Sequence, residues 1–145
     1  MDASPREAGV RVLSRETLPV RCEDDVVLVR RRARELGQRR GFDGFAQAAI
    51  TTATSEISRN TLVHGGGGSA DLEEVERGGR RGVRVTCRDA GPGIVDLTRA
   101  LAGGFSVTGT LGLGLSGTRR LVDELDVQTA PGRGTTVVLI KWARR

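Results

Sequence analysis

Apolar residues recur along this chain with two different periods, and these periods predict where its helices lie. A helical period runs from Asp24 and Asp25, which are predicted to cap the helix, to about Gln38. After a break at Gly41-Phe42-Asp43-Gly44, a second helical period extends to about Val63. The residues predicted to face the core from these two helices are Val26, Val29, Ala33, Leu36, Ala46, Ala49, Ile50, Ala53 and Ile57.

Alternating and short continuous apolar runs predict the strands. The expected strands are 16–22, about 70–76, 82–88, 124–129 and 135–142, the last two joined as a hairpin through Ala130-Pro131-Gly132-Arg133-Gly134. One or two helical turns are expected over 96–102, a loop over 103–112 and a helix over 113–123. Together these elements predict an α+β fold, a two-layer sandwich with helices on one face of a mixed, mostly antiparallel sheet.

The length of 145 residues fits one domain. Residues 1–12 are polar and expected to be loose, and residues 13–145 are expected to form the single domain. The apolar stretches are too short to span a membrane and the N-terminus does not resemble a signal peptide, so a cytoplasmic protein is predicted. Cys87 continues the alternation of Val83 and Val85, which predicts a buried strand cysteine, and Cys22 is given no role.

The net charge of +5 comes almost entirely from arginine, and six arginines fall between Arg30 and Arg40. A solvated helix face is the first interpretation of this run. Docking of an acidic protein comes second. DNA binding comes third, because the few aromatic residues are not interleaved with the run, as base stacking would require. No direct contact with nucleic acid or membrane is expected.

Glu56 and Asn60 are four residues apart in the second helix, so both side chains project from one helical face at the edge of the core. A carboxylate there can accept a proton from an attacking hydroxyl group, and an amide oxygen one turn away can bind Mg²⁺. Taken alone, such a spacing is more often a solvent-facing polar pair. His64, the only histidine, is interpreted as a polar residue near a helix C-terminus rather than a catalytic one.

Asp89 ends an alternating strand and is followed directly by Gly91-Pro92-Gly93. A carboxylate in this place can accept a hydrogen bond from the amino group of adenine, which guanine lacks at that position. The glycines let the backbone turn tightly and pass close to a base. Without further motifs, an ordinary turn at the end of a strand would explain these residues.

A glycine-rich run covers Gly109 to Gly114 and leads into a predicted helix. Gly112 to Gly117 satisfies the spacing G-x-G-x-x-G, but the residues before it predict a loop instead of the buried strand that a dinucleotide-binding unit requires. No lysine follows the glycines, which excludes a Walker A loop. Free backbone N–H groups at a helix start can still hold phosphates, and the glycines suit a lid. Gly132-x-Gly134-Thr135 predicts a hairpin turn.

In this order and at these distances, the four motifs resemble the nucleotide-binding boxes of the GHKL ATPase superfamily, whose members share the Bergerat ATP-binding fold. Within it, the chain is most similar to the anti-sigma regulatory factor family, and there to the RsbT-type serine/threonine switch kinases of the stressosome. The stretches that carry this resemblance are 51–60, 89–94, 104–106, 111–117 and 120–124.

The resemblance implies ATP and Mg²⁺ as cofactors, and it assigns roles to the motif residues. Glu56 would be the catalytic base, Asn60 would bind the metal, and Asp89 would bind adenine with Thr135 supporting it. The remaining residues implied to surround the nucleotide are Gly91, Gly93, Gly109, Leu111, Gly112, Leu113 and Gly114.

The same resemblance implies phosphorylation of a serine or threonine on a STAS-domain protein, and binding and activation of a PP2C-type phosphatase. The chain departs from the anti-sigma branch in one respect, because no arginine or lysine lies between Gly103 and Gly117. This weakens direct binding of a sigma factor as the main role. The alternative interpretation is an anti-sigma-like module that sequesters a sigma factor and uses nucleotide as a conformational ligand.

Overall fold

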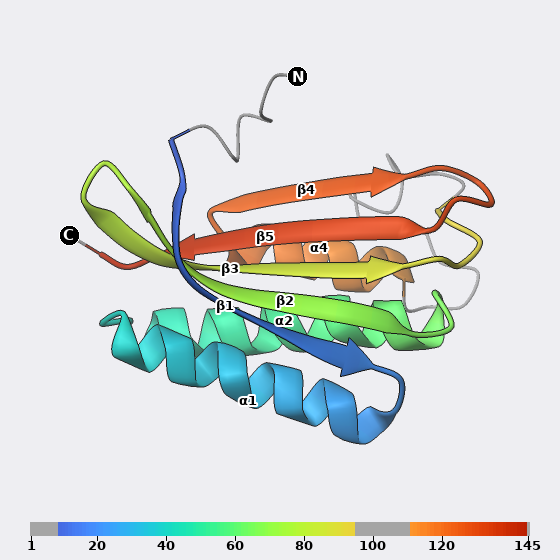
Figure 1. Ribbon diagram of the computed structural model, residues 1–145, viewed down its shortest axis with the longest axis horizontal. Coiled ribbons are helices and arrows are strands. Elements are labelled where there is room, and N and C mark those ends of the chain that lie inside the picture. The colour runs from blue at the N-terminus through green and yellow to red at the C-terminus, as the bar shows by residue number, and fades with distance from the viewer. Residues whose placement is uncertain (1–8, 95–110, 145) are drawn as a thin grey trace.

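The computed structural model describes residues 9–94 and 111–144, which form a sheet covered on one face by helices (Figure 1). The strands are β1 (Arg11–Val20), β2 (Gly68–Arg77), β3 (Arg80–Asp89), β4 (Glu124–Thr129) and β5 (Thr135–Trp142). The helices are α1 (Glu23–Arg39), α2 (Gly44–Val63) and α4 (Leu111–Leu121). None of the helices within the described ranges has the length and apolar composition needed to cross a bilayer.

The sheet has five strands in the order β1-β2-β3-β5-β4. Every neighbouring pair among them is antiparallel, so the described strands include no parallel pairing. The predicted α+β two-layer fold is confirmed. The closing hairpin has the predicted strands, 124–129 and 135–142, and the helical turns predicted over 96–102 lie outside the described residues.

Strand β1 begins at Arg11, before the predicted start at Glu16, and so includes the last two residues of the segment expected to be loose. It lies at the edge of the sheet and is mostly exposed on both faces, which removes the apolar alternation by which a strand is recognised. Pairing with β2 holds it instead, and Arg11 donates a hydrogen bond of 2.9 Å to Glu76. The strand therefore depends on its partner strand.

The predicted N-cap of α1 was wrong. Cys22 is the N-cap residue, and Glu23, Asp24 and Asp25 fill the first helical turn, where negative charge stabilises the helix dipole. The Asp25 carboxylate reaches back and accepts a hydrogen bond of 2.8 Å from the backbone N–H of Arg21. The helix start is thus held by an acidic side chain inside the helix instead of by one at its cap.

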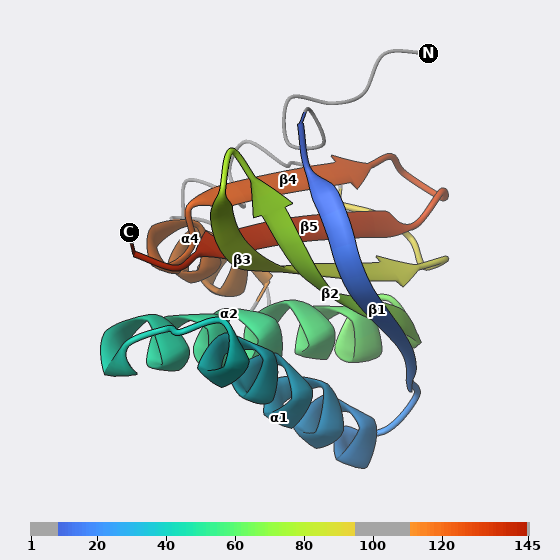
Figure 2. The ribbon, with the colours of Figure 1, turned by 60° about the vertical axis from the view of Figure 1, so that its left-hand side comes forward.

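The helices and the sheet enclose one hydrophobic core, with α1 and α2 side by side against the inner face of the sheet (Figure 2). All nine core positions predicted on α1 and α2 are buried. From the sheet, the side chains that meet them are Val20, Ala70, Leu72, Val83, Val85, Cys87, Val137 and Leu139. Cys87 is buried, as predicted, and burial raises the pKa of its thiol to about 12, which disfavours the reactive thiolate. Each large aliphatic side chain contributes about 1.5–3 kcal/mol by leaving water, so this contact dominates stability.

The arginine run of α1 is divided between the sheet and solvent. Arg39 and Arg40 lie 3.4 and 3.7 Å from the carboxylate of Glu74, a buried residue of β2. Arg32 pairs with Glu16 of β1 and with Glu35. Half of the run therefore also forms ion pairs with the sheet, while the Arg32 and Arg39 side chains remain 41% and 62% exposed, as expected for a solvated helix face.

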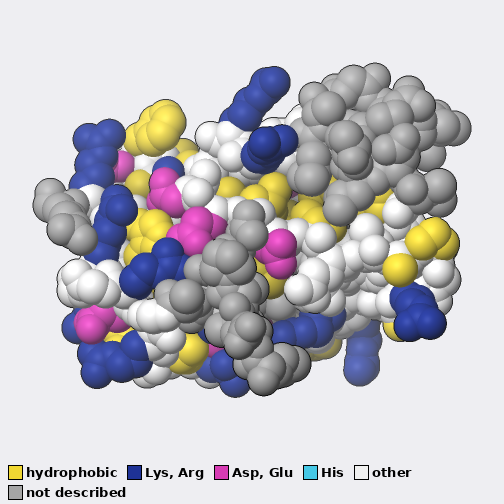
Figure 3. Space-filling model, turned by 90° about the horizontal axis from the view of Figure 1, so that it is seen from above, with side chains coloured by type: hydrophobic (Ala, Val, Ile, Leu, Met, Phe, Trp, Pro, Cys, Tyr) yellow, Lys and Arg dark blue, Asp and Glu magenta, His cyan; other side chains and the backbone are white. Residues whose placement is uncertain are grey.

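The outer face of the sheet bears no helix in the described ranges and carries acidic and basic side chains close together (Figure 3). Glu73 of β2 is only 2% exposed there. Its carboxylate accepts hydrogen bonds of 2.7 Å from Arg84 and 2.8 Å from Arg15, and Arg88 donates one of 2.6 Å to Asp71. Opposite charges on neighbouring strands thus satisfy one another across β1, β2 and β3.

Acid is expected to weaken the fold through Glu73. Burial alone would raise the pKa of this carboxyl group, but the hydrogen bonds from Arg84 and Arg15 more than offset it, so the pKa lies below its ordinary value. A carboxyl group whose pKa is lower in the folded state contributes stability above its unfolded pKa, and loses it as the pH falls through the folded pKa. The free energy of unfolding in urea should fall over that acidic range, and less steeply for Glu73→Gln. Equal slopes for both proteins would contradict this.

Candidate functional site

Residues from three distant parts of the chain meet in a pocket between the helices and the inner face of the sheet, here called the inner pocket. Asn60 comes from α2, Asp89 from the end of β3 and Thr135 from the start of β5. The full lining is Ile57, Asn60, Thr61, His64, Gly65, Asp89, Ile94, Leu115, Thr135 and Val137. The pocket encloses about 20 Å³, enough for one water molecule. The segment predicted to lead into the phosphate-binding helix, up to Thr110, lies outside the described residues.

The strand registers bring Asp89 and Thr135 together. Val83, Val85 and Cys87 of β3 point into the core, and Asp89 is the next residue in this row. Asp89 pairs directly with Thr135 across the β3–β5 ladder, so both side chains lie on the helix-facing side of the sheet. One carboxylate oxygen of Asp89, Oδ1, accepts a hydrogen bond of 2.9 Å from the Gly91 N–H. A carboxylate can accept several hydrogen bonds, so Asp89 retains capacity for a ligand donor.

Thr129, a residue that the sequence analysis missed, completes this row on β4. Its hydroxyl oxygen accepts a hydrogen bond of 2.8 Å from the Ile94 N–H and lies 2.9 Å from the Thr135 hydroxyl oxygen. It also donates to the Gly134 carbonyl at 3.1 Å. The single Thr129 proton can go either to Gly134 or to Thr135. When it goes to Gly134, Thr135 is the donor between the two hydroxyls, and the Thr135 oxygen keeps lone pairs for a ligand. Only the register of the hairpin shows this role.

Asn60 has an unsatisfied polar atom at the inner pocket. Its side-chain nitrogen, Nδ2, is buried and has no hydrogen-bond partner among the described residues. Such an atom costs about 1–3 kcal/mol when it is left alone, so the position fits a polar ligand. A half-turn of the amide would instead present its oxygen to the pocket, and an amide oxygen can coordinate Mg²⁺. Asn60 therefore fits a metal that is held mainly by phosphate oxygens and water.

Glu56 lies one helical turn before Asn60 on α2 and is half-buried. As their spacing predicts, the two residues lie on one side of the helix. Glu56 is not among the residues that line the inner pocket. The pocket thus joins Asn60 to Asp89 and Thr135, while Glu56 lies beyond it.

The glycine motifs differ in how much of them the structure describes. Gly93 has a φ of +79°, and a Cβ on Gly91 would lie 2.7 Å from the Gly65 Cα, so the turn after Asp89 is as tight as predicted. Gly109 lies outside the described residues.

Helix α4 begins at Leu111, so Leu111 and Gly112 belong to the helix and not to the predicted loop. Glycine can adopt helical dihedrals but adds no apolar side chain, which hid the helical period in the sequence. Leu111, Gly112, Leu113 and Gly114 form the first helical turn. Backbone N–H groups in a first turn have no partner within their helix, so they are available to an anion.

His64 lies at the C-cap of α2, as its sequence position indicated, and its backbone N–H donates to the Asn60 carbonyl at 3.0 Å. It also lines the inner pocket, which the sequence interpretation did not anticipate. A residue at this helix end reaches the pocket because the chain turns there toward the end of β3.

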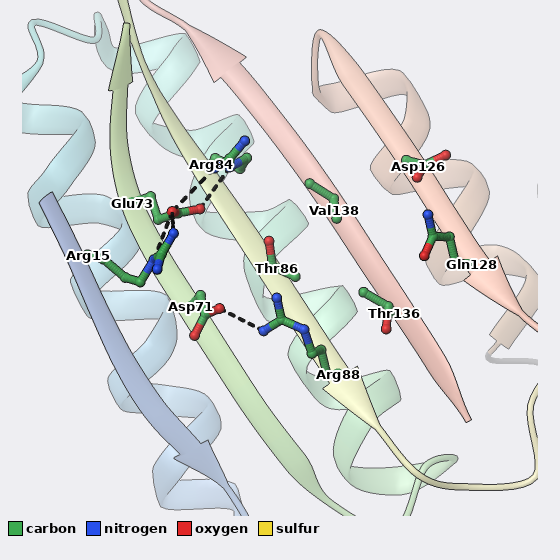
Figure 4. A pocket seen from close by; sticks show the side chains of 10 residues that line it. All are labelled: Arg15, Asp71, Glu73, Arg84, Thr86, Arg88, Asp126, Gln128, Thr136 and Val138. Carbon is green, nitrogen blue, oxygen red and sulfur yellow. Dashed lines mark hydrogen bonds and ion pairs between the residues drawn. The ribbon is translucent and has the colours of Figure 1, made fainter. Parts of the chain in front are cut away.

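A larger pocket of about 350 Å³, here called the outer pocket, lies on the opposite face of the sheet (Figure 4). Arg15, Glu73 and Arg84 point toward one another at one side of it, and Arg88 points toward Asp71. The remaining lining residues are Thr86, Asp126, Gln128, Thr136 and Val138. Of the predicted site residues that the structure describes, none lines it. Size alone would favour the outer pocket, but Asn60, Asp89 and Thr135 come together at the inner pocket.

Known proteins resemble the chain along almost its whole length. The family model described as histidine kinase-like ATPase domain matches residues 18–141. The serine/threonine-protein kinase RsbT of Bacillus subtilis (strain 168) is 39% identical over 125 residues, which cover 86% of this chain and 94% of RsbT. An anti-sigma F factor of Thermoanaerobacter sp. (strain X514) is 29% identical over 100 residues, or 66% of this chain and 69% of that protein.

Among solved structures, the mycobacterial sensor histidine kinase MprB superposes with a TM-score of 0.49 at 18% sequence identity. The superposition covers 90% of this chain and 99% of the other.

Proposed function

The chain belongs to the family of histidine kinase-like ATPase domains, and from that premise we infer that it is an ATP-dependent serine/threonine protein kinase of a partner-switching regulatory system. One structural observation carries this inference: Asn60, Asp89 and Thr135 converge on one pocket from separate elements. The 39% identity to a serine/threonine-protein kinase over nearly all of its length supports the same activity.

At the inner pocket, which would have to widen beyond its volume of about 20 Å³ to admit a base, the Asp89 carboxylate and the Thr135 hydroxyl oxygen would bind the adenine of ATP. The Asp89 carboxylate is a hydrogen-bond acceptor, the Thr135 oxygen can accept as well when its own proton goes to Thr129, and adenine offers an amino group as donor. The Asp89–Gly91 hydrogen bond orients the carboxylate before any ligand arrives. We propose that this preorganised acceptor pair distinguishes adenine from guanine.

At the other end of the site, three groups of this chain would act on the phosphates. Backbone N–H groups of the first turn of α4 would hold them, and the Asn60 amide oxygen would bind Mg²⁺, which supplies neutralising charge when bound. Glu56 would accept the proton of the attacking hydroxyl group as general base. Gly109 would belong to the segment that leads to these N–H groups.

We further propose the partners of this kinase. The phosphoacceptor is a serine or threonine on a STAS-domain protein, and a PP2C-type phosphatase is bound and activated by the released kinase. The setting is a cytoplasmic stress or sigma-factor signalling switch of the stressosome type. The similarity to both RsbT and an anti-sigma F factor supports a partner-switching role.

The second candidate is an anti-sigma module that sequesters a sigma factor and does not act mainly as an enzyme. The 29% identity to an anti-sigma F factor favours it. The lack of any arginine or lysine between Gly103 and Gly117 opposes it, because that branch of the family usually carries a basic residue there.

Phosphotransfer to a candidate STAS-domain protein separates the two functions. With radiolabelled Mg-ATP, we expect phosphoserine or phosphothreonine on that partner and no stable label on the chain itself. The phosphorylated partner should bind more weakly on gel filtration, because its new dianion is repelled by the phosphates of the bound nucleotide. A stable ATP-dependent complex with a sigma factor, without phosphate on any STAS protein, would establish the alternative.

A further inference from the structure

Gly65, the second residue after α2, lies directly against the side chain of Asp89. A Cβ atom at position 65 would lie 2.5 Å from both the Cβ and the Oδ2 atoms of Asp89. Real Cβ atoms do not approach other heavy atoms closer than 3.0 Å. Any side chain at this position would therefore displace Asp89 or the loop that carries Gly65.

Backbone conformation does not explain why residue 65 is a glycine. Its neighbours Gly66 and Gly67 have φ values of +76° and +102°, which favour glycine strongly. Gly65 does not have a positive φ, so other residues could adopt its backbone conformation. The contact with Asp89 is thus the constraint that excludes a side chain.

Gly65 also contacts Asn60 and the turn after β3. Its N–H donates a hydrogen bond of 3.1 Å to the carbonyl oxygen of Asn60. A Cβ on Gly91 would lie 2.7 Å from the Gly65 Cα and 2.8 Å from the Gly65 carbonyl oxygen. The backbone of Gly65 therefore contacts both the end of α2 and the turn after β3.

We propose that Gly65 is a positioning residue that sets the Asp89 carboxylate relative to Asn60 and so determines the preference for adenine over guanine. The nature of the ligand rests on the proposed function. The Gly91 N–H binds Oδ1 of Asp89, and the Gly65 backbone lies against Cβ and Oδ2 of the same side chain. An added methyl group would force the Asp89 side chain to rotate away. Asp89 would then lose both its hydrogen bond from the Gly91 N–H and its orientation toward the adenine.

The substitution Gly65→Ala tests this role, with Gly44→Ala as the matched control. Gly44 begins the same helix, and no atom lies within 4 Å of a Cβ built there. We expect Gly65→Ala to lower ATP affinity at least about tenfold by calorimetry, as for a lost buried hydrogen bond, and to reduce the ATP-to-GTP preference by a similar factor. The Gly91 amide resonance should shift in Gly65→Ala and remain in place in Gly44→Ala.

A double variant shows whether Gly65 acts through Asp89. In the background of Asp89→Asn, adding Gly65→Ala should lower ATP affinity by no more than about twofold, because residues that act as a unit are not additive. If the double variant instead shows the product of the two single losses of ATP affinity, the proposal is overturned. The same holds if Gly65→Ala leaves the ratio of ATP to GTP affinity unchanged.

Two further cases need their own measurement: a Gly65→Ala protein that cannot be purified, and an unsubstituted protein that does not bind ATP. If Gly65→Ala is too unstable to purify, Gly91→Ala strains the same contact from the other side and should give the same loss of preference; a normal preference would overturn the proposal. If the unsubstituted protein does not bind ATP, the proposed function fails. The Gly91 resonance then still decides whether Gly65 positions Asp89.

Discussion

Glu56→Gln should abolish phosphotransfer while the protein still binds ATP. Glutamine keeps the size and polarity of glutamate but has no site that accepts a proton at neutral pH, so a positioned base loses its function. The expected loss is roughly a hundred-fold or more in the rate of transfer. Glu56 lies beyond the inner pocket on α2, so adenine contacts should persist. Single-turnover transfer to the STAS-domain partner and calorimetry with ATP measure the two quantities.

Two other variants serve as comparisons for Glu56→Gln. Glu35→Gln makes the same change on α1, where the carboxylate only pairs with Arg32, and should leave the transfer rate unchanged. Asn60→Ala should differ from both, because loss of the amide should weaken Mg²⁺-dependent nucleotide binding as well as transfer. A Glu56→Gln protein that phosphorylates its partner at nearly the normal rate would show that Glu56 is not the base.

Asp89→Asn is expected to weaken ATP binding by about 1–3 kcal/mol, which is the cost of leaving a polar pair unsatisfied. In affinity this is roughly a five- to 150-fold loss. The Gly91 N–H would keep the remaining side-chain oxygen as its acceptor, so the new amide group would be turned toward the base. A donor would then face the donor amino group of adenine. Calorimetry with ATP and with GTP measures both the loss and the change in preference.

The control for this change is Asp71→Asn on the outer face of the sheet. Asp71 accepts a hydrogen bond from Arg88 and lines the outer pocket, so ATP affinity should not change. Equal ATP affinities for Asp89→Asn and the unsubstituted protein would remove Asp89 from the adenine contacts. A loss caused by Asp71→Asn would instead indicate that the outer pocket matters for nucleotide binding.

The amino-acid sequence by itself determined the two-layer α+β fold, the core faces of α1 and α2, the closing hairpin and the candidate residues Glu56, Asn60 and Asp89. These features follow from local patterns. A helix that buries one side repeats its apolar residues about every 3.6 residues, and a strand that buries one face repeats them every two residues. Asp89 was recognisable because it continues the buried row of β3 at the point where glycines begin.

Only the tertiary structure decided which distant residues meet and how each is held. The pairing of Asp89 with Thr135 and of Thr135 with Thr129 depends on the strand registers. The contact of Gly65 with Asp89 depends on where the end of α2 meets the end of β3. Strand β1 shows the same dependence, because an exposed edge strand has no buried face to mark it and pairing alone defines its start. Such contacts join segments far apart in the chain, and no local period of hydrophobic residues records them.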